Sequence, residues 1–484
     1  MRPLALACGA ALAALAGGGR AETLGDAIAL AYQSNPTLQA QRATQRALDE
    51  TYVQARAGYE PTLGAQASIT SDDNNETSAQ TSFPGRSQTS QGALTITQPI
   101  YTGGLVSSQV NAAGNYVLAG RETLRQTEQT VLQNVIQVYI NVRRDQESLA
   151  IAEENLTVLS RQLDESRARF DVGEITRTDV AETEARVAGG KAQLSTAQAQ
   201  LAISRAGYAS IVGQNPGDLA PEPSLGKLLP ATVDQAFDMA EGNNPQIRGA
   251  DYTERGSAAK VAAAKAQTRP TLSLKGSLGL GSVGFAGGGF AQPSSLATFG
   301  RDASATAVLN VPLFTGGMTS SQIRQAAENN NVDRIGIEAA RRQVLLAVSQ
   351  AWNQLLGARA NLKANEEQVR AANIAFEGTR EEAQVGLRTT LDVLITEQDL
   401  SNAQLALVTA RHDEYAAGAA VLAAMGLLTA RNLAIGTAIY DPKVNFDRVK
   451  GAGAVPWDKA VSAIDRLGAP GTPSSPPLGN PEGR

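Results

Sequence analysis

Side chains able to do nucleophilic, acid–base or metal chemistry are few in this chain. Among 484 residues, His412 is the single His and Cys8 the single Cys. A literal G-x-G-x-x-G runs from Gly279 to Gly284, but a dinucleotide fingerprint needs a helix after it, and "FAGGGFAQPSS" is typical of an external loop. His412, in "ARHDEY", is predicted to be a surface residue of a helix. We therefore expect no catalytic residues, no metal site and no cofactor.

A second group of polar residues lies in two short segments that resemble each other. "VGEITRTDV" begins at Val172 and "VGLRTTLDV" at Val385, each between long Ala/Gln/Glu-rich stretches. In each segment a glycine would end one helix in the left-handed conformation, and a Thr-x-x-Asp box would start the next. The glycines are Gly173 and Gly386, and the boxes are Thr176–Asp179 and Thr389–Asp392. Capping and compensation of the helix dipole are sufficient reasons for both aspartates.

Composition argues against a nucleic-acid partner and for export. The chain is 18% charged with a formal net charge of -5, so no polyanion-binding surface is indicated. Residues 1–21 are predicted to be a secretory signal, with a basic Arg2, an apolar stretch and a small-x-small cleavage site before Glu22. Cys8 lies inside that stretch, and "LALAC" is only a faint match to a lipoprotein cleavage box. The exported chain is therefore expected to lack cysteine.

The exported part of the sequence consists of two copies of one unit. "NP" at Asn35 recurs at Asn244, and "QPIYTGG" from Gln98 corresponds to "VPLFTGG" from Val311. The predicted domains are a signal peptide at 1–21, a first repeat at 22–220, a Pro-rich linker at 221–230, a second repeat at 231–430, and a C-terminal segment at 431–484. The Pro/Gly/Ser-rich tail from Gly468 is expected to be disordered.

Each copy predicts two β-strands that alternate apolar and polar residues. The alternation is clear in "TLGAQASIT" from Thr62 and "TLSLKGSLGL" from Thr271, and weaker at 92–100 and 303–311. Segments of about 9–11 residues with one apolar face are typical of outer-membrane strands. A half-buried soluble sheet is the alternative. No exported segment is long and apolar enough for a transmembrane helix, and "SDDNNETSAQTSFPGRSQTS", residues 71–90, is expected to be an external loop.

Long helices make up the rest of each copy. A helix predicted from Leu105 to Phe170 carries apolar residues at heptad spacing, which indicates coiled-coil packing. About 66 residues at about 1.5 Å each give a rod of about 100 Å. The flanking helices at 22–58 and 177–213 are each near half that length, so two of them stacked end to end would match one rod.

These elements predict an assembly of several copies. Four strands cannot close a barrel, and a closed barrel is the edge-free sheet that lipid tolerates. Two copies would give eight strands with a filled interior, and three would give twelve, enough for a pore. The predicted fold class is mainly α with a membrane β-barrel: a trimeric 12-stranded outer-membrane barrel, four strands per chain, continuous with a long periplasmic α-helical barrel and built from two internal repeats.

At this point the sequence resembles the TolC family of outer-membrane efflux and secretion channels. The resemblance covers about residues 22–430 and rests on the double copy, "QPIYTGG"/"VPLFTGG" and "VGEITRTDV"/"VGLRTTLDV". It implies a homotrimer in the outer membrane of a Gram-negative bacterium, in contact with outer-membrane lipid and extending through the periplasm. It also implies docking on a periplasmic adaptor (membrane fusion) protein and an inner-membrane ABC or proton-driven transporter, for type I secretion of proteins or efflux of small toxic molecules.

The resemblance also assigns roles at the two helix breaks. The residues implied at a constricted periplasmic entrance are Arg388, Asp392, Thr178 and Asp179, with Arg388 tied to the Thr178–Asp179 pair. The residues implied in adaptor binding are Val172, Gly173, Thr176, Val385, Gly386 and Thr389. Two positions depart from the family pattern, Ile395 in place of a second acid and Ala383 in place of a Tyr. These departures predict an entrance held closed by fewer interactions, without a second ring of acids and without a contact from a Tyr.

A second class of protein is consistent with part of the sequence. A periplasmic coiled-coil adaptor or structural tether without its own pore would explain the heptads and the signal. It would leave unexplained four alternating strands at matching places in two copies.

Overall fold

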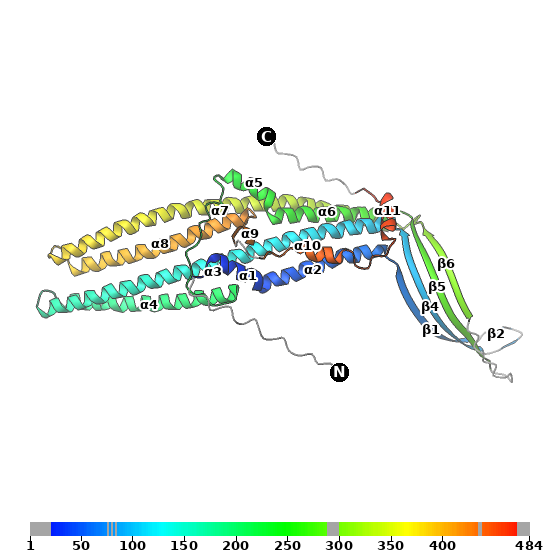
Figure 1. Ribbon diagram of the computed structural model, residues 1–484, viewed down its shortest axis with the longest axis horizontal. Helices are drawn as coiled ribbons and strands as arrows, with labels where there is room; N and C mark the ends of the chain where they lie inside the picture. The colour runs from blue at the N-terminus through cyan, green and yellow to red at the C-terminus, as the bar shows by residue number, and fades with distance from the viewer. Residues whose placement is uncertain are drawn as a thin grey trace, which may run out of the picture. The chain divides into compact units, whose positions relative to one another are not determined.

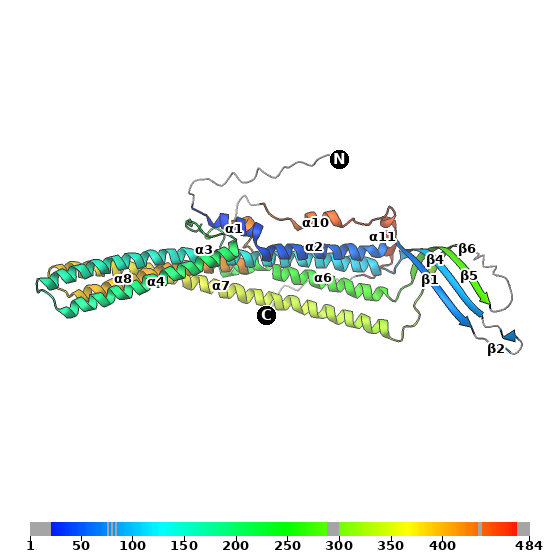
Figure 2. The same ribbon diagram turned by 90° about the horizontal axis from the view of Figure 1, so that it is seen from below.

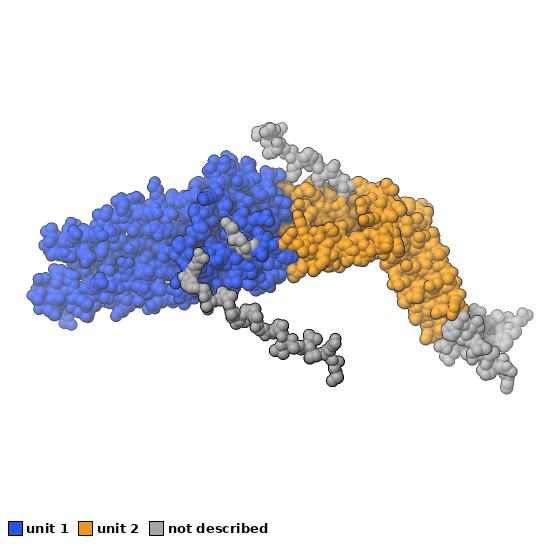
Figure 3. All heavy atoms as spheres, in the orientation of Figure 1, with its two compact units in different colours: residues 1–43, 122–248, 339–440 blue, residues 44–121, 249–338, 441–484 orange. Residues whose placement is uncertain are grey.

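The computed structural model describes residues 21–74, 77–78, 81–82, 85–287, 300–433 and 438–471. The chain divides into two compact units (Figure 3). Unit 1 comprises residues 1–43, 122–248 and 339–440, and unit 2 comprises residues 44–121, 249–338 and 441–484. Each unit takes segments from both sequence repeats, so the compact units are not the repeats themselves.

The same order of elements occurs twice along the chain (Figures 1 and 2). The first set is α1 (Leu24–Ser34), α2 (Pro36–Arg56), the 3-10 helix η1 (Ala57–Tyr59), β1 (Thr62–Asn74), β4 (Gly85–Tyr101), α3 (Leu105–Asp171) and α4 (Arg177–Val212). The second set is α5 (Val233–Asn243), α6 (Pro245–Ala266), β5 (Thr271–Gly287), β6 (Gly300–Asn310), α7 (Met318–Gln384) and α8 (Thr390–Ala424). Three short helices follow, α9 (Ala430–Leu433), α10 (Pro442–Val449) and α11 (Asp458–Leu467). None of the helices in the described residues is long and apolar enough to span a membrane.

The four long strands of unit 2 form one antiparallel sheet with an uncovered apolar face. Their order is β1-β4-β5-β6, so β1 and β6 are its edges. The register places Leu63 opposite Ile96 and Leu94 opposite Leu278, which puts these residues on one face. Leu272, opposite Leu309, is half-buried, and eight other large apolar side chains of that face are exposed: Leu63, Ile69, Leu94, Ile96, Leu274, Leu278, Leu280 and Leu309. A half-buried soluble sheet would cover this face, and in the described chain nothing does.

The strands extend beyond their predicted ends, so two loop predictions are wrong in part. β1 continues to Asn74 and β4 begins at Gly85, and a two-stranded hairpin of β2 (Thr77–Ser78) and β3 (Thr81–Ser82) lies between them. Most of the loop expected at 71–90 is therefore strand. β5 likewise continues to Gly287, through Gly279–Gly284 and into the expected loop, of which 288–299 lies outside the described residues. Backbone pairing needs no apolar side chains, so polar Ser/Thr segments can extend a ladder.

Two buried asparagines join helices end to end in unit 1. Asn35 donates from Nδ2 to the carbonyl of Ile211 in α4 (3.1 Å) and accepts at Oδ1 from the N–H of Thr37 in α2 (3.0 Å). Its own N–H donates to Ala31 and closes α1 (2.9 Å). One residue thus satisfies the ends of three helices, and the prolines that follow Asn35 and Asn244 suit the first helical position.

Asn244 makes the same junction in the second copy. Its Nδ2 donates to the carbonyl of Ala424 in α8 (2.8 Å), its Oδ1 accepts from the N–H of Gln246 in α6 (2.8 Å), and its N–H donates to Ala240 in α5 (2.9 Å). The predicted end-to-end stacking of half-length helices is present at both junctions. The repeated "NP" is the sequence signature of these junctions.

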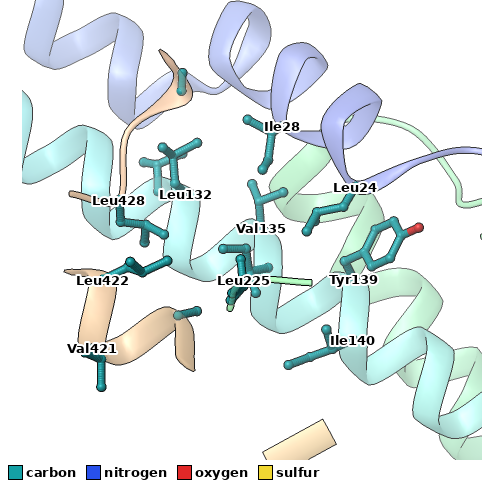
Figure 4. Packing of buried hydrophobic residues seen from close by; sticks show 14 of the residues in the cluster. Leu24, Ile28, Leu132, Val135, Tyr139, Ile140, Leu225, Val421, Leu422 and Leu428 are labelled. Carbon is teal, nitrogen blue, oxygen red and sulfur yellow. The ribbon is translucent and has the colours of Figure 1, made fainter. Parts of the chain in front are cut away.

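The main hydrophobic core of unit 1 lies around the middle of α3. Figure 4 shows Leu24 and Ile28 of α1 against Val135 and Tyr139 of α3, and all four are buried. The Tyr139 hydroxyl lies 2.6 Å from the carbonyl oxygen of Ala220 and 3.0 Å from that of Glu22.

Glu22, the first residue after the predicted signal, belongs to this core region. It forms a parallel bridge with Leu219, in which its N–H donates to Asp218 (2.8 Å) and its carbonyl accepts from Ala220 (2.9 Å). Its carboxylate also accepts from the Tyr208 hydroxyl (2.6 Å). The residue that follows the predicted signal is thus held through both its backbone and its side chain.

The predicted heptad positions are buried unevenly. Val135 and Val142 of α3 and Val348 and Leu355 of α7 are fully buried in the core, whereas Phe170 at the end of α3 is exposed. A smaller cluster of Leu159, Leu163, Val187 and Leu394 joins the helices nearer the breaks. The heptad seam is therefore covered within one chain at the core and at this smaller cluster, and it is exposed at the end of α3.

The junctions predict a measurable loss of stability when Asn244 is truncated. Asn244→Ala leaves the carbonyl of Ala424 and the first turn of α6 without their partner, which should lower the free energy of unfolding by about 1–3 kcal/mol. Denaturant unfolding followed by circular dichroism measures this change. The matched control is Asn243→Ala, because the Asn243 side chain bonds only to Met239 within its own helix. Equal effects of the two substitutions would contradict the assigned role.

Candidate functional site at the two helix breaks

The two helix breaks in unit 1 have the same backbone construction. Gly173 follows α3 with φ 82° and Gly386 follows α7 with φ 81°, in the left-handed region that favours glycine. The N–H of Gly173 donates to Phe170 (2.9 Å) and that of Glu174 to Arg169 (2.9 Å). The second break repeats this pattern, and together the two bonds are a Schellman motif. The predicted helix-ending role of both glycines is present.

Both Thr-x-x-Asp boxes are formed with reciprocal hydrogen bonds. In the second break the Asp392 N–H donates to the Thr389 hydroxyl (3.2 Å), and Asp392 Oδ2 accepts from the N–H (3.0 Å) and hydroxyl (2.8 Å) of Thr389. Thr176 and Asp179 are arranged alike in the first break. The Thr backbone hydrogen bond, followed by its hydroxyl, holds the pKa of each Asp carboxyl below its usual range. Both carboxylates therefore serve as caps within the chain.

Arg388 bonds to a residue that sequence reasoning did not single out. Its Nε lies 2.9 Å from Glu382 Oε2, and this contact raises the pKa of Arg388, with a smaller contribution from Asp392. The first break has an ion pair of opposite polarity, in which Arg169 on the helix contacts Glu174 in the turn at 3.2 Å. The one sequence feature that could have indicated this ion pair is the acidic Glu382, six residues before Arg388.

The structure does not bring Arg388 together with Thr178 and Asp179 within this chain. Arg388 contacts Glu382, and the Asp179 carboxylate bonds to Thr176. The tie of Arg388 to Thr178 and Asp179 stays a prediction.

The residues predicted to bind an adaptor form the exposed surface of the breaks. Val172 and Val385 are each 72% exposed, an unusual state for Val, and a side-chain atom added at Gly173 or Gly386 would meet nothing within 4 Å. The two departures from the family pattern have different surroundings. Ala383 is buried in the last turn of α7, whereas Ile395 is exposed on α8.

A buried carboxylate lies one turn beyond the second box. Glu397 on α8 is buried, and within the described part of the chain its Oε1 has no hydrogen-bond partner. Burial raises the pKa of Glu397 to about 7, and Arg186 offsets part of this increase. The burial of Glu397 could not be predicted from the sequence, because "TEQD" is an ordinary polar helical stretch.

Comparison with known proteins identifies the family. The family model described as outer membrane efflux protein matches residues 27–214 and 236–427, and the chain belongs to this family. Outer membrane efflux protein BepC of Brucella suis is 35% identical over 436 residues, which cover 89% of this chain and 91% of BepC. Outer membrane protein TolC of Escherichia coli is 26% identical over 438 residues, 87% of this chain and 86% of TolC.

A solved structure gives the same fold. The CmeC outer membrane channel of Campylobacter jejuni superposes with a TM-score of 0.72 at 15% identity, covering 90% of each chain. The predicted family, fold class and outer-membrane location are confirmed, and the family relatives are channel proteins. The comparisons favour the channel over the periplasmic adaptor.

Glu397 predicts a dependence of stability on pH. Below pH 4.5 the carboxyl is protonated in both the folded and unfolded chain. Between pH 4.5 and about 7 the unfolded chain loses this proton first, so the contribution of Glu397 to stability falls as pH rises and then levels off. Glu397→Gln should raise the melting temperature more at pH 8 than at pH 4.5. Glu381→Gln, at an exposed position on α7, is the control, and a pH-independent effect of Glu397→Gln would contradict the assignment.

Proposed function

We propose that this protein is a homotrimeric outer-membrane channel that conducts secreted proteins or small toxic molecules to the cell exterior. The observation that carries the proposal is the sheet of unit 2, which has an exposed apolar face and, among the described strands, two unpaired edges in β1 and β6. Exposed apolar faces and free edges are costly in water. Contact with lipid removes the cost of the apolar face, and pairing with other copies of the chain removes the cost of the free edges.

Three copies suit this sheet best. In a closed antiparallel ring, β6 of one copy pairs with β1 of the next, and three copies give twelve strands. That number leaves an open lumen, whereas two copies would give a barrel whose interior is filled by side chains. The face opposite the apolar one carries polar groups, including Ser277 and Ser304, whose hydroxyls lie 2.7 Å apart. This polar face would line the pore.

The helical part of the chain supports a conduit that extends through the periplasm. α3 and α7 are single helices of 67 residues each, and the buried asparagines align α4 with α2 and α8 with α6. Heptad residues that are exposed in one chain, such as Phe170, would be covered by neighbouring helices. The two breaks then form the periplasmic mouth, which is the place for an adaptor linked to an inner-membrane ABC or proton-driven transporter.

The proposed gate opens or closes according to which residues Arg388 contacts. In one chain Arg388 pairs with Glu382 on the exposed end of α7. The proposed closed state ties Arg388 to Thr178 and Asp179, with Asp392 forming a ring of three carboxylates in the trimer. Because the Arg388–Glu382 pair is exposed, it is weak, and exchange between acidic partners costs little.

Single-channel recordings in planar bilayers test both the channel and its gate. The wild-type trimer should conduct poorly, and Arg388→Ser should raise conductance or open probability because it removes the tie. The comparison variant is Glu382→Gln, which removes the competing partner and should not open the channel. A protein that forms no trimer and no conductance contradicts the proposed function, whereas unchanged conductance in Arg388→Ser contradicts only the gate.

If the exposed valines at the breaks contact the adaptor, a charge placed at one of them should weaken adaptor binding. Val385→Asp should reduce co-purification of a periplasmic adaptor and export, because it places a charge on an apolar contact without disturbing the fold. Ile374→Asp, at an exposed apolar position within α7, is the matched control. Retained adaptor binding in Val385→Asp, with trimers intact, would exclude this surface.

A further inference from the structure

The last described helix, α11, belongs to unit 2 and buries Asp458, Ser462 and Asp465 together with Val461. Asp465 is fully buried, and its Oδ1 accepts from the N–H (2.7 Å) and hydroxyl (2.8 Å) of Thr102 and from the N–H of Gly104 (3.1 Å). Its Oδ2 accepts from the N–H of Ser107 (3.3 Å) and the hydroxyl of Tyr59 (3.4 Å). A carboxylate with so many donors fixes the helix in one position.

A second carboxylate of α11 anchors its beginning. Asp458 is buried and pairs with Arg56 at the end of α2, and Arg56 also donates to the carbonyl of Lys450. The Trp457 indole N–H donates to Gln98 Oε1 (3.0 Å) in β4. α11 is therefore held at its start by the end of α2 and by β4, and near its end by the segment where β4 passes into α3.

This segment, residues 101–104 or "YTGG", is here named the first joint, and its repeat at residues 314–317, "FTGG", the second joint. Their glycines share one backbone shape, with φ 70° and 84° at the first joint and 61° and 84° at the second. The first joint is covered: a side-chain atom added at Gly104 would lie 2.4 Å from Ala469. The second joint is bare, since nothing lies within 4 Å of the same point at Gly317, and Leu313 and Phe314 are 92% and 89% exposed.

α11 itself presents apolar side chains away from the first joint. Leu467 is 91% exposed, and Ile464 and Trp457 are also exposed. α11 thus buries both of its acids with Val461, and Ile464 and Leu467 stay exposed on its outer side beside the charged Lys459 and Arg466. Unit 2 thus carries two exposed apolar surfaces, and Figure 2 shows α11 on one side of the unit and the start of α7, which follows the second joint, on the other.

We propose that α11 of one copy covers the second joint of the neighbouring copy. The proposal rests on the trimer proposed above. α11 contacts η1 and β4 beside the β1 edge, and the second joint directly follows the β6 edge. Pairing of β6 with the neighbour's β1 therefore brings these two surfaces to the same border. Two different patches on opposite sides of a subunit are what a closed ring requires.

Disulfide trapping tests this contact in the full-length trimer. Cys8 is the single Cys and lies in the predicted signal peptide, so Phe314→Cys with Leu467→Cys gives an exported chain with two cysteines. Oxidation should produce covalent dimers and trimers on denaturing non-reducing gels, reversed by reductant. Each single variant, and Leu467→Cys combined with Val332→Cys at an exposed position on α7, should give much less.

The outcomes separate this proposal from the proposed function. Heat-modifiable trimers without an interchain disulfide overturn the α11 contact and leave the channel standing. Quenching of Trp457 fluorescence by brominated lipid in such trimers would assign the outer face of α11 to the membrane instead. Absence of any trimer overturns both proposals. As a second measurement, Leu467→Asp should lower the temperature at which the trimer band converts to monomer, and an unchanged temperature contradicts the contact.

Discussion

The helical part of this protein depends on how a single asparagine, through its backbone and its side-chain amide, satisfies three helix ends at once. Each helix end leaves backbone groups that need partners, and a buried end without them is costly. At Asn35 and again at Asn244, the backbone closes one helix, the side-chain oxygen starts a second, and the side-chain nitrogen closes a third. Without this solution, the last turn of α4 and the first turn of α2 would each leave a buried backbone group without its partner.

The two breaks show how one construction can carry different electrostatics. Schellman glycines and capping boxes are alike in both copies, so the backbone is fixed by the same short-range interactions. The ion pairs at Glu174 and Arg388 differ in polarity because these turn positions face solvent and do not support the fold. The caps also engage Asp179 and Asp392 in stabilising the helices. Structural and gating roles of these aspartates are therefore compatible, since capping uses one carboxylate oxygen of each.

Features set by neighbours in sequence could be predicted, and features set by distant contacts could not. The glycine turns and the boxes follow from local rules, and α4 runs from Arg177 to Val212, close to the predicted 177–213. The helix predicted at 22–58 is instead divided into α1, α2 and η1. The strands were predicted too short, because apolar alternation stops where backbone pairing continues. The partner of Arg388 and the burial of Glu397 depend on which helix faces meet. The position of α11 was also beyond sequence reasoning, because Asp465 reaches donors more than 350 residues earlier.

The bridge at Glu22 has a consequence for biogenesis. This residue directly follows the predicted cleavage site, its backbone bonds to Asp218 and Ala220 just before the predicted linker, and its carboxylate bonds to Tyr208 of α4. A chain still held by its leader at the inner membrane would have to complete this core with residues 1–21 attached at that point. The predicted cleavage site therefore adjoins a backbone bridge that closes the core, so the predicted cleavage and the completion of this core involve the same short stretch of chain.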